Sequence, residues 1–340
     1  MKYPKRLNKN GAIAVVAPSA GFKEKKFVIM CENSKKKLES LGYKICYSNS
    51  CFNDINGRSN TSLKRAEEFM EMYGSSDNDI LISLSGGEYE MEILDNLDLN
   101  KIKKMHPKLF CGCSDNTILT FLLTTYCDIA SVYGHNFYEI GINHKVQNDY
   151  IEFLQGINKS YCEIKEVEEK DESWKSTTPQ LSYNCNYHND WKLYYDKDNK
   201  IEVKGMIIGG LLDNLIGICG TKYDKVKTFL NKYSEEGFVW YLDICTLNPE
   251  EVKRGLWQLK NAGWFNYSKL VMVARPINQS DSYGKNYIEN MYDELKSLNI
   301  PILFDVNIGH IAPTYHMYNG AIAKVTYNNA NGKIEYIDNI

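Results

Sequence analysis

The 340-residue sequence lacks the features that mark several large classes of protein. No run approaches the ~20 apolar residues that a helix needs to span a bilayer. The opening residues Met1–Leu7 are polar and have no apolar core of a signal peptide. No basic tract stands out and the net charge is only −3, so general attraction to nucleic acid or to an acidic membrane is not expected. These absences predict a cytoplasmic protein without a nucleic-acid or membrane partner.

Signatures of metal and nucleotide binding are also missing. The ten cysteines include no Cys-x-x-Cys pair, and Cys111 and Cys113 are too close together to form half of a zinc site. Scattered cysteines in a reducing compartment are mostly small buried apolar residues. Neither a Gly-x-Gly-x-x-Gly run nor a P-loop follows the first expected strand, which disfavours a nucleotide-binding α/β domain. We therefore expect no metal and no cofactor.

The first half of the chain alternates apolar strands with helices. Apolar runs are expected to form buried parallel strands at residues 12–17 and 79–84. Further strands are expected at residues 43–47 and 108–111. Helices are expected between and after these strands, at residues 23–40, 62–72, 90–97 and 116–126. This order is typical of a parallel α/β sheet whose site lies at the carboxyl ends of the strands.

Length and composition predict two domains, because 340 residues exceed what one core usually fills. Residues 1–150 are expected to form an N-terminal α/β domain of Rossmann or flavodoxin type. Residues 151–195 are polar with weak periodicity and are expected to form a connection, and residues 196–340 a second domain. Strands of the second domain are expected at 203–208, 238–242, 270–274 and 301–304. Its helices are expected at 213–219, 249–262 and 285–297.

A serine lies in the turn Gly112–Asn116, between an apolar strand and an apolar helix. At such a turn Ser114 would project from the edge of a sheet, while the start of the helix supplies backbone N–H groups for a developing oxyanion. The turn is similar to a nucleophile elbow, but Asn116 breaks the Gly-x-Ser-x-Gly pattern, so an ordinary α/β-hydrolase is not expected. Taken alone, the local sequence is better explained by Ser114 as a helix cap.

Three further segments contain the other groups that a serine hydrolase needs. Gly86 and Gly87 follow a strand at the same expected sheet edge, where glycine lets the backbone approach a ligand and donate an N–H. His310 is the one histidine of six that follows a glycine after a buried strand of the second domain, which makes it the best candidate for a general base. Asp243 ends the strand 238–242 and suits a carboxylate that orients a histidine. Each also has a structural explanation, namely a tight turn, a packed histidine or an ion pair.

In their order and spacing these segments resemble the LD-carboxypeptidase family of serine peptidases, and most closely its branch of microcin C immunity proteins. The likeness spans nearly the whole chain. Residues 107–117 match the family's PK-x-x-x-G-x-SD-x-T signature. The other segments that carry the likeness are residues 7–19, 85–87, 94–98, 133–134, 205–210 and 220–221, and the segment around His310.

The resemblance implies a Ser–acid–His triad and a two-domain architecture with a smaller, β-rich C-terminal domain. Carried over residue by residue, Ser114 is the nucleophile and His310 the base. The backbone N–H groups of Gly87 and Asp115 are the oxyanion donors. The family's acid is a glutamate, whereas this chain has Asp243, which is one methylene shorter. The resemblance also implies a homodimer.

The activity that the resemblance implies is metal-independent hydrolysis of an amide bond next to a free carboxylate. Two substrates stay open, a peptidyl or aminoacyl nucleotide as in the immunity branch and an L,D-muropeptide. Gly86, Gly210 and Trp191 are candidate substrate-binding residues, and Trp174 and Trp191 could stack on an adenine ring or simply pack. The alternative to an enzyme is an impaired homologue that binds such ligands without turnover, because an aspartate stands at the position of the triad glutamate.

Overall fold

The computed structural model describes residues 1–170, 176–195 and 199–337, so Trp174 lies outside the described residues. The chain divides into two compact units. The first comprises Met1–Asn158 and Glu172–Tyr183, and the second comprises Lys159–Asp171 and Asn184–Ile340. The polar segment 151–195 therefore contributes residues to both units.

The first unit is built on a parallel sheet. Its strands lie in the order β5-β4-β3-β1-β2, and each neighbouring pair is parallel. The strands are β1 (Ala12–Val16), β2 (Lys44–Tyr47), β3 (Ile80–Ser83), β4 (Leu109–Gly112) and β5 (Ser131–Tyr133). Every residue of β3 and β4 is buried, as expected for strands that are covered on both faces. The predicted parallel α/β domain is confirmed.

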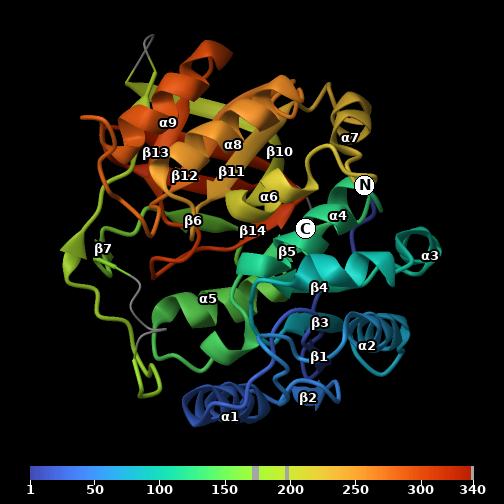
Figure 1. Ribbon diagram of the computed structural model, residues 1–340. Helices are drawn as coiled ribbons and strands as arrows, with labels where there is room; N and C mark the ends of the chain where they lie inside the picture. The colour runs from blue at the N-terminus through green and yellow to red at the C-terminus, as the bar shows by residue number, and fades with distance from the viewer. Residues whose placement is uncertain (171–175, 196–198, 338–340) are drawn as a thin grey trace. The chain divides into compact units, whose positions relative to one another are not determined.

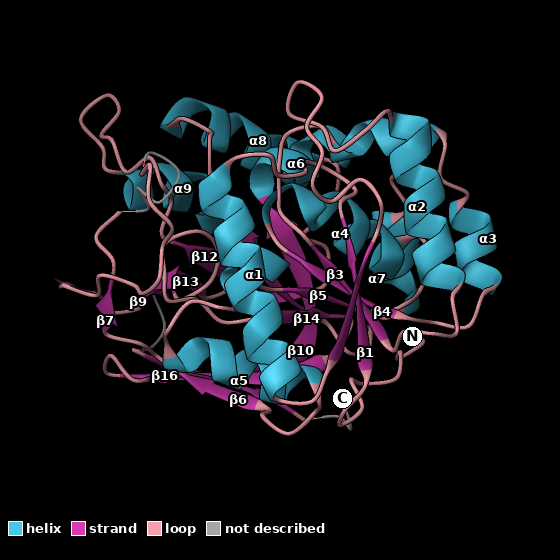
Figure 2. Ribbon diagram, turned by 90° about the horizontal axis from the view of Figure 1, so that it is seen from below, coloured by secondary structure: helices cyan, strands magenta, loops and turns pink. Residues whose placement is uncertain are grey.

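Helices flank this sheet (Figure 2). Helix α1 packs against β2, and α2 packs against β1. The α-helices are α1 (Lys25–Ser40), α2 (Ser62–Gly74), α3 (Leu99–Lys104), α4 (Thr117–Thr125) and α5 (Lys145–Leu154). Short 3₁₀ turns are η1 (Glu90–Asp95), η2 (Ser114–Asn116) and η3 (Phe137–Glu139). The segment expected to be helical at 90–97 is thus a 3₁₀ turn, and the helix expected from residue 116 begins one residue later. Neither α3 nor α5 was predicted.

The second unit is built on a larger, mixed sheet (Figure 1). In the described part of the chain it has eight strands in the order β6-β16-β15-β10-β11-β12-β13-β9. The central strands β10 to β13 are parallel, and the flanking pairs are antiparallel. The predicted strand-rich C-terminal domain is confirmed. Because most of residues 159–195 belong to it, this unit is as large as the first rather than smaller.

The strands of the second unit include four that the apolar runs predicted, β10 (Lys200–Leu211), β11 (Phe238–Asp243), β12 (Ser268–Ala274) and β13 (Ile302–Val306). The others are β6 (Ser160–Cys162), β7 (Glu166–Val167), β8 (Tyr187–His188), β9 (Lys192–Tyr194), β14 (Met317–Asn319), β15 (Ile322–Asn328) and β16 (Gly332–Tyr336). Its helices are α6 (Leu212–Ile218), α7 (Val226–Lys232), α8 (Pro249–Asn261), α9 (Tyr287–Leu295) and the turn η5 (Lys296–Leu298). Figure 1 shows α8 and α9 side by side against the sheet.

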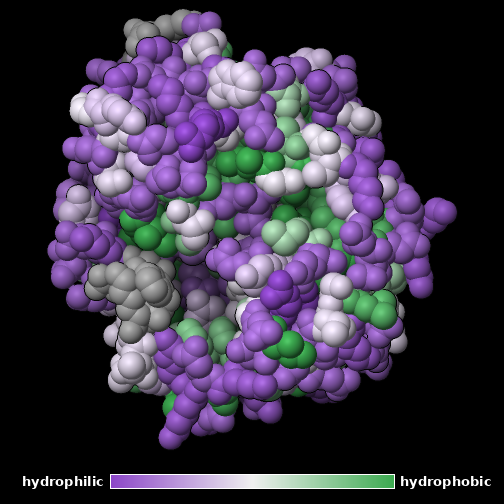
Figure 3. Space-filling model, viewed as in Figure 1, coloured by the Kyte–Doolittle hydropathy of each residue, from purple (hydrophilic) through white to green (hydrophobic). Residues whose placement is uncertain are grey.

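The surface contrasts with the apolar sheets. The face drawn in Figure 3 is mostly hydrophilic, with apolar side chains in small groups between polar ones. Within the described residues, the helices are all too short or too polar to cross a membrane.

Candidate active site

The Ser114 turn joins β4 to α4 in a strained conformation. Ser114 has a left-handed φ of 63°, which costs a non-glycine residue about 1–3 kcal/mol and persists only where its surroundings enforce it. The backbone N–H of Ser114 donates to Oη of Tyr133 at 3.1 Å, and that of Cys113 donates to Oδ1 of Asn136 at 3.1 Å. A serine held in such a sharp turn between strand and helix has the local geometry of a nucleophile elbow.

The glycine loop after β3 passes directly against this serine. A Cβ atom at Gly86 would lie 2.7 Å from Cβ and 3.0 Å from Oγ of Ser114, so only glycine lets the backbone come this close. Gly87 has a φ of 152°, and a Cβ there would overlap the hydroxyl of Ser19. The first unit therefore brings together the serine and the glycine loop that the sequence predicted separately.

Asp115 is buried beneath the turn, and its side chain ties several segments together. Oδ2 of Asp115 accepts from the hydroxyl of Ser19 and, at 2.8 Å, from the backbone N–H of Glu90. Glu90 is completely buried, and its Oε2 accepts from the N–H of Leu119 in α4 at 3.3 Å. Burial, together with the Asp115 carboxylate, raises the pKa of Glu90 well above its ordinary value. Sequence reasoning missed Glu90, because a single glutamate in a turn gives no signal of burial.

The second unit brings together the predicted acid and base. Asp243 ends β11 and is completely buried, and its Oδ2 lies 2.7 Å from Nδ1 of His310. Its other oxygen, Oδ1, accepts the backbone N–H of Ile244 at 2.8 Å. Gly309 makes this approach possible, since a Cβ there would overlap the Asp243 carboxylate and its φ is 90°. The Asp243 carboxylate therefore reaches the His310 ring, with Gly309 packed directly against it.

Opposing influences act on the His310 ring. Burial favours the neutral ring, but the Asp243 carboxylate and the nearby Cys245 side chain outweigh burial and raise the pKa of His310 well above its ordinary value. The side chain is 15% exposed, so the ring keeps some access to its surroundings. A buried carboxylate beside a histidine fixes its orientation and stabilises the imidazolium, which is the role of the acid in a serine-hydrolase triad.

The loop that carries His310 is anchored by Asn307. Oδ1 of Asn307 accepts from Nε1 of Trp191 at 2.7 Å and from the N–H of Ile164 at 2.9 Å, and Nδ2 donates to the Ile164 carbonyl at 3.0 Å. Trp191 is only 1% exposed, and its ring packs against Gly332. The indole therefore supports the His310 loop and offers no open face for a nucleobase.

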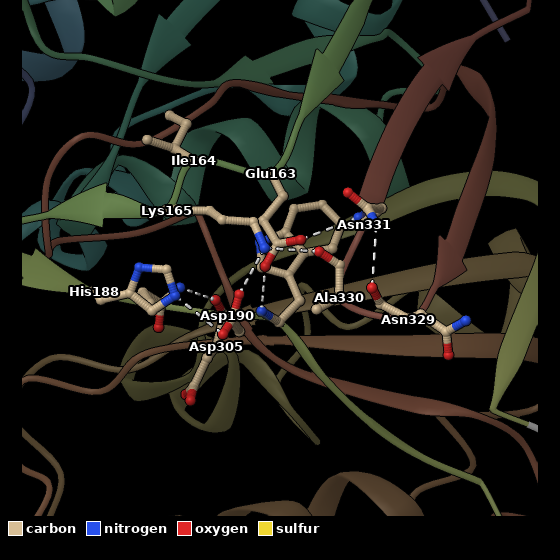
Figure 4. Close-up of polar contacts among 12 residues, drawn as sticks. Glu163, Ile164, Lys165, His188, Asp190, Asp305, Asn329, Ala330 and Asn331 are labelled. Atoms are coloured by element: carbon tan, nitrogen blue, oxygen red, sulfur yellow. Dashed lines mark hydrogen bonds and ion pairs between the residues drawn. The ribbon is translucent and has the colours of Figure 1, made fainter.

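Polar contacts hold the segment around Trp191 in the second unit (Figure 4). Lys165 pairs with Asp190 at 2.8 Å and donates to the Ala330 carbonyl at 2.9 Å. His188 lies between two carboxylates, 3.1 Å from Oδ2 of Asp190 and 3.4 Å from Oε1 of Glu166. Among the residues that the structure describes, no cluster of three or more His, Cys, Asp or Glu side chains could hold a metal ion.

Gly210 lies on β10, the strand next to the one that ends in the acid. It is in register with Leu242, and the following residue, Leu211, is in register with Asp243. A Cβ at the preceding Gly209 would overlap the Tyr241 carbonyl, so Gly209 lets β10 approach β11 closely. The pair thus lies beside the acid, whereas Ser114 and the loop of Gly86 and Gly87 belong to the first unit.

Two family models match this chain, one on each side of residues 135–203. The LD-carboxypeptidase N-terminal domain matches residues 13–134, and the LD-carboxypeptidase C-terminal domain matches residues 204–325. The chain belongs to the LD-carboxypeptidase family. The N-terminal match contains Ser114, and the C-terminal match contains Asp243 and His310.

Relatives in this family are similar over most of their length. A Vibrio cholerae protein that carries the name of a carboxypeptidase is 21% identical, with 98% of each chain covered. The microcin C7 self-immunity protein MccF of Escherichia coli is 23% identical, with 81% of this chain and 78% of that protein covered. A Bacillus subtilis protein named "Probable murein peptide carboxypeptidase" is 23% identical, with 94% and 90% covered. Carboxypeptidase and immunity names thus occur side by side among the relatives.

Solved structures have the same fold as this LD-carboxypeptidase family member. MccF in complex with glutamyl sulfamoyl guanosine has a TM-score of 0.81 and 20% identity over 98% of each chain. A muramoyltetrapeptide carboxypeptidase from Oxalobacter formigenes has a TM-score of 0.71 and 20% identity, with 96% of this chain and 99% of that chain covered. At this level of identity the likeness shows the fold alone, which agrees with the predicted architecture.

Proposed function

We propose that this LD-carboxypeptidase family member is a serine hydrolase that cleaves an amide bond next to a free carboxylate. The hydroxyl of Ser114 attacks the carbonyl, and His310 takes its proton and returns it to the leaving amine. Asp243 orients the ring and stabilises its charged form. The N–H groups of Gly87 and Asp115 bind the oxyanion, and water then hydrolyses the acyl-enzyme.

The contact between Asp243 and His310 is the observation that carries the proposal. The family's glutamate is replaced by a shorter aspartate, which raises the alternative of a binder without turnover. At 2.7 Å from Nδ1 of His310, the Asp243 carboxylate is close enough to act as the acid of a triad. The strained turn at Ser114 is independent support from the other unit. The proposal requires the Ser114 hydroxyl and the His310 ring to meet when substrate binds.

The replacement Ser114→Ala tests the nucleophile. We expect kcat to fall by about 10⁴-fold or more, as is usual when a triad nucleophile is removed. Labelling by a serine-reactive phosphonate should disappear as well. Ser76→Ala is the matched control, because Ser76 is exposed in the loop after α2 and should leave both readouts unchanged. Turnover that persists in Ser114→Ala would contradict the assignment, and ligand binding by the wild type without turnover or labelling would favour the impaired homologue.

The substrate class is the second part of the proposal. MccF is named as a self-immunity protein, and one of its solved structures is a complex with an aminoacyl sulfamoyl nucleoside. Other family members are named as carboxypeptidases of murein peptides. We propose a small substrate of one of these two classes, a peptidyl or aminoacyl nucleotide or an L,D-muropeptide. An assay of an aminoacyl sulfamoyl adenylate beside an L,D-tetrapeptide separates them, since cleavage of one without the other identifies the class. The homodimer stays a prediction.

A further inference from the structure

Asn116 stands where an ordinary nucleophile elbow has glycine, and its side chain is completely buried. Its Nδ2 donates to three oxygens, the carbonyls of Ser85 and Cys113, both at 2.9 Å, and Oδ1 of Asn136 at 3.2 Å. These acceptors lie in the loops that follow β3, β4 and β5. One amide group therefore joins three loops at the carboxyl edge of the first sheet.

The surroundings allow this amide only one orientation. All three neighbouring atoms are acceptors, so the nitrogen must face them and its two hydrogens serve three partners. Oδ1 of Asn116 is buried and has no hydrogen-bond partner in the described part of the chain. A buried acceptor of this kind costs about 1–3 kcal/mol, which the three donated bonds offset. The site therefore uses Asn116 as a donor.

Two of the acceptors, the carbonyls of Ser85 and Cys113, belong to peptide groups just before the proposed oxyanion donors Gly87 and Asp115. The Ser85 carbonyl shares a rigid peptide plane with the N–H of Gly86, the residue before Gly87. The Cys113 carbonyl shares a plane with the N–H of Ser114, the residue before Asp115. A Cβ at Gly86 would lie 3.6 Å from the backbone N of Asp115, so the two loops approach each other where the oxyanion donors are expected.

Gly112 makes room for the buried amide. A Cβ at Gly112 would lie 2.9 Å from both Cβ and Cγ of Asn116 and 3.0 Å from Cβ of Ser83. Asn136 supports the same turn from its other side, since its Oδ1 accepts the Cys113 N–H and its Nδ2 donates to the Cys113 sulfur at 3.1 Å. The amide of Asn116 thus lies in a closely packed polar network and does not contact solvent.

We propose that Asn116 is a positioning residue that locks the glycine loop to the serine turn and so keeps both oxyanion donors aimed at one point. The inference rests on the proposed function and extends it. Asn116 does not touch substrate and acts through the peptide groups of Ser85 and Cys113. Preorganised donors of this kind stabilise the transition state more than the bound substrate, so their loss lowers kcat rather than substrate affinity.

Asn116→Asp tests the proposal, because aspartate keeps the shape but places an oxygen against three acceptors. We expect kcat to fall by about 10²-fold, comparable to the loss of one oxyanion donor, with KM changed by less than about three-fold. The rate of phosphonate labelling of Ser114 should fall in parallel with kcat. Asn96→Asp is the matched control, because Asn96 is exposed and its amide donates to the Ser62 hydroxyl at 3.2 Å. If Asn116→Asp does not fold, Asn116→Ser replaces it with the same expectations.

The readouts separate positioning from a purely structural role. A structural role would lower the unfolding temperature and the fraction of titratable active sites, while kcat per titrated site stayed at the wild-type value, and that result would overturn the inference. Wild-type kcat in Asn116→Asp or Asn116→Ser would overturn it too. Ser114→Ala is measured in parallel. If that variant is inactive, the hydrolase proposal survives the failure of the inference, whereas an active Ser114→Ala means that the proposed function itself has failed.

Discussion

At the scale of single residues, the buried carboxylate of Asp243 sets the pH range in which His310 can act as the proposed base. The base must be neutral to accept a proton, and the carboxylate favours its charged form. Because the pKa of His310 is raised, the neutral ring becomes available only at a pH above the ordinary histidine value of about 6.5. The acidic limb of the kcat/KM profile should therefore lie above that pH.

Replacing Asp243 with asparagine should move that limb and lower its plateau. Removing the negative charge destabilises the imidazolium, so the pKa of His310 falls and the limb shifts to lower pH. The plateau of kcat should drop by about 10⁴-fold, because the amide does not hold the correct tautomer. The profile of kcat/KM between pH 5 and 9 tests both effects. A limb that stays in place would show that Asp243 is not the partner that raises this pKa.

The close packing of Gly309 against Asp243 can be tested by adding a methyl group at this position. A Cβ there would overlap the Asp243 carboxylate in a left-handed backbone conformation, so Gly309→Ala should separate the acid from the base. We expect kcat to fall by about 10²-fold or more, as expected when a catalytic group is displaced by an ångström. Gly217→Ala is the control, because Gly217 lies in α6 and a Cβ there would meet no described atom within 4 Å beyond its own helix and its chain neighbours. Equal activity of the two variants would contradict the close packing of Gly309 on Asp243.

At the scale of elements, the segment 151–195 contributes structure that its composition does not reveal. Its polarity predicts a connection, yet its residues add β6 and β9 to the edges of the second sheet and place Trp191 under the His310 loop. Short edge strands pair through backbone groups and need no apolar run, so periodicity does not reveal them. The buried apolar strands β3, β4, β11 and β12 were predicted because burial on both faces requires apolar runs.

Trp191→Phe tests the support that this segment gives to the loop. The change keeps an aromatic ring but removes the N–H that donates to Asn307, so one buried acceptor loses a partner. The free energy of unfolding should fall by about 1–3 kcal/mol, with a smaller effect on kcat than that of Gly309→Ala. Trp257→Phe is the matched control on α8, where the side chain is 58% exposed and a change within about 0.5 kcal/mol is expected. Urea unfolding of both variants measures the difference, and equal stability would contradict a supporting role for Trp191.

At the scale of the whole molecule, the proposed chemistry divides between the two units. The nucleophile and its glycine loop are formed within the first, and the acid and base within the second. Within the first unit Asp115 and Asn116 are buried under Ser114, and within the second unit Asn307 holds the loop of His310. The family models divide the chain in the same way, with one match in each unit.

The sequence by itself determined the residue types, their order and the α/β class, because apolar runs, glycine turns and motif spacing are local properties of the chain. It also supplied the family, through motifs that are specific only as an ordered set. Only the tertiary structure decided that the shorter Asp243 reaches His310, that Trp191 is covered, and that Asn116 links three loops. Those facts depend on distances between residues far apart in sequence, and the folded backbone alone sets such distances.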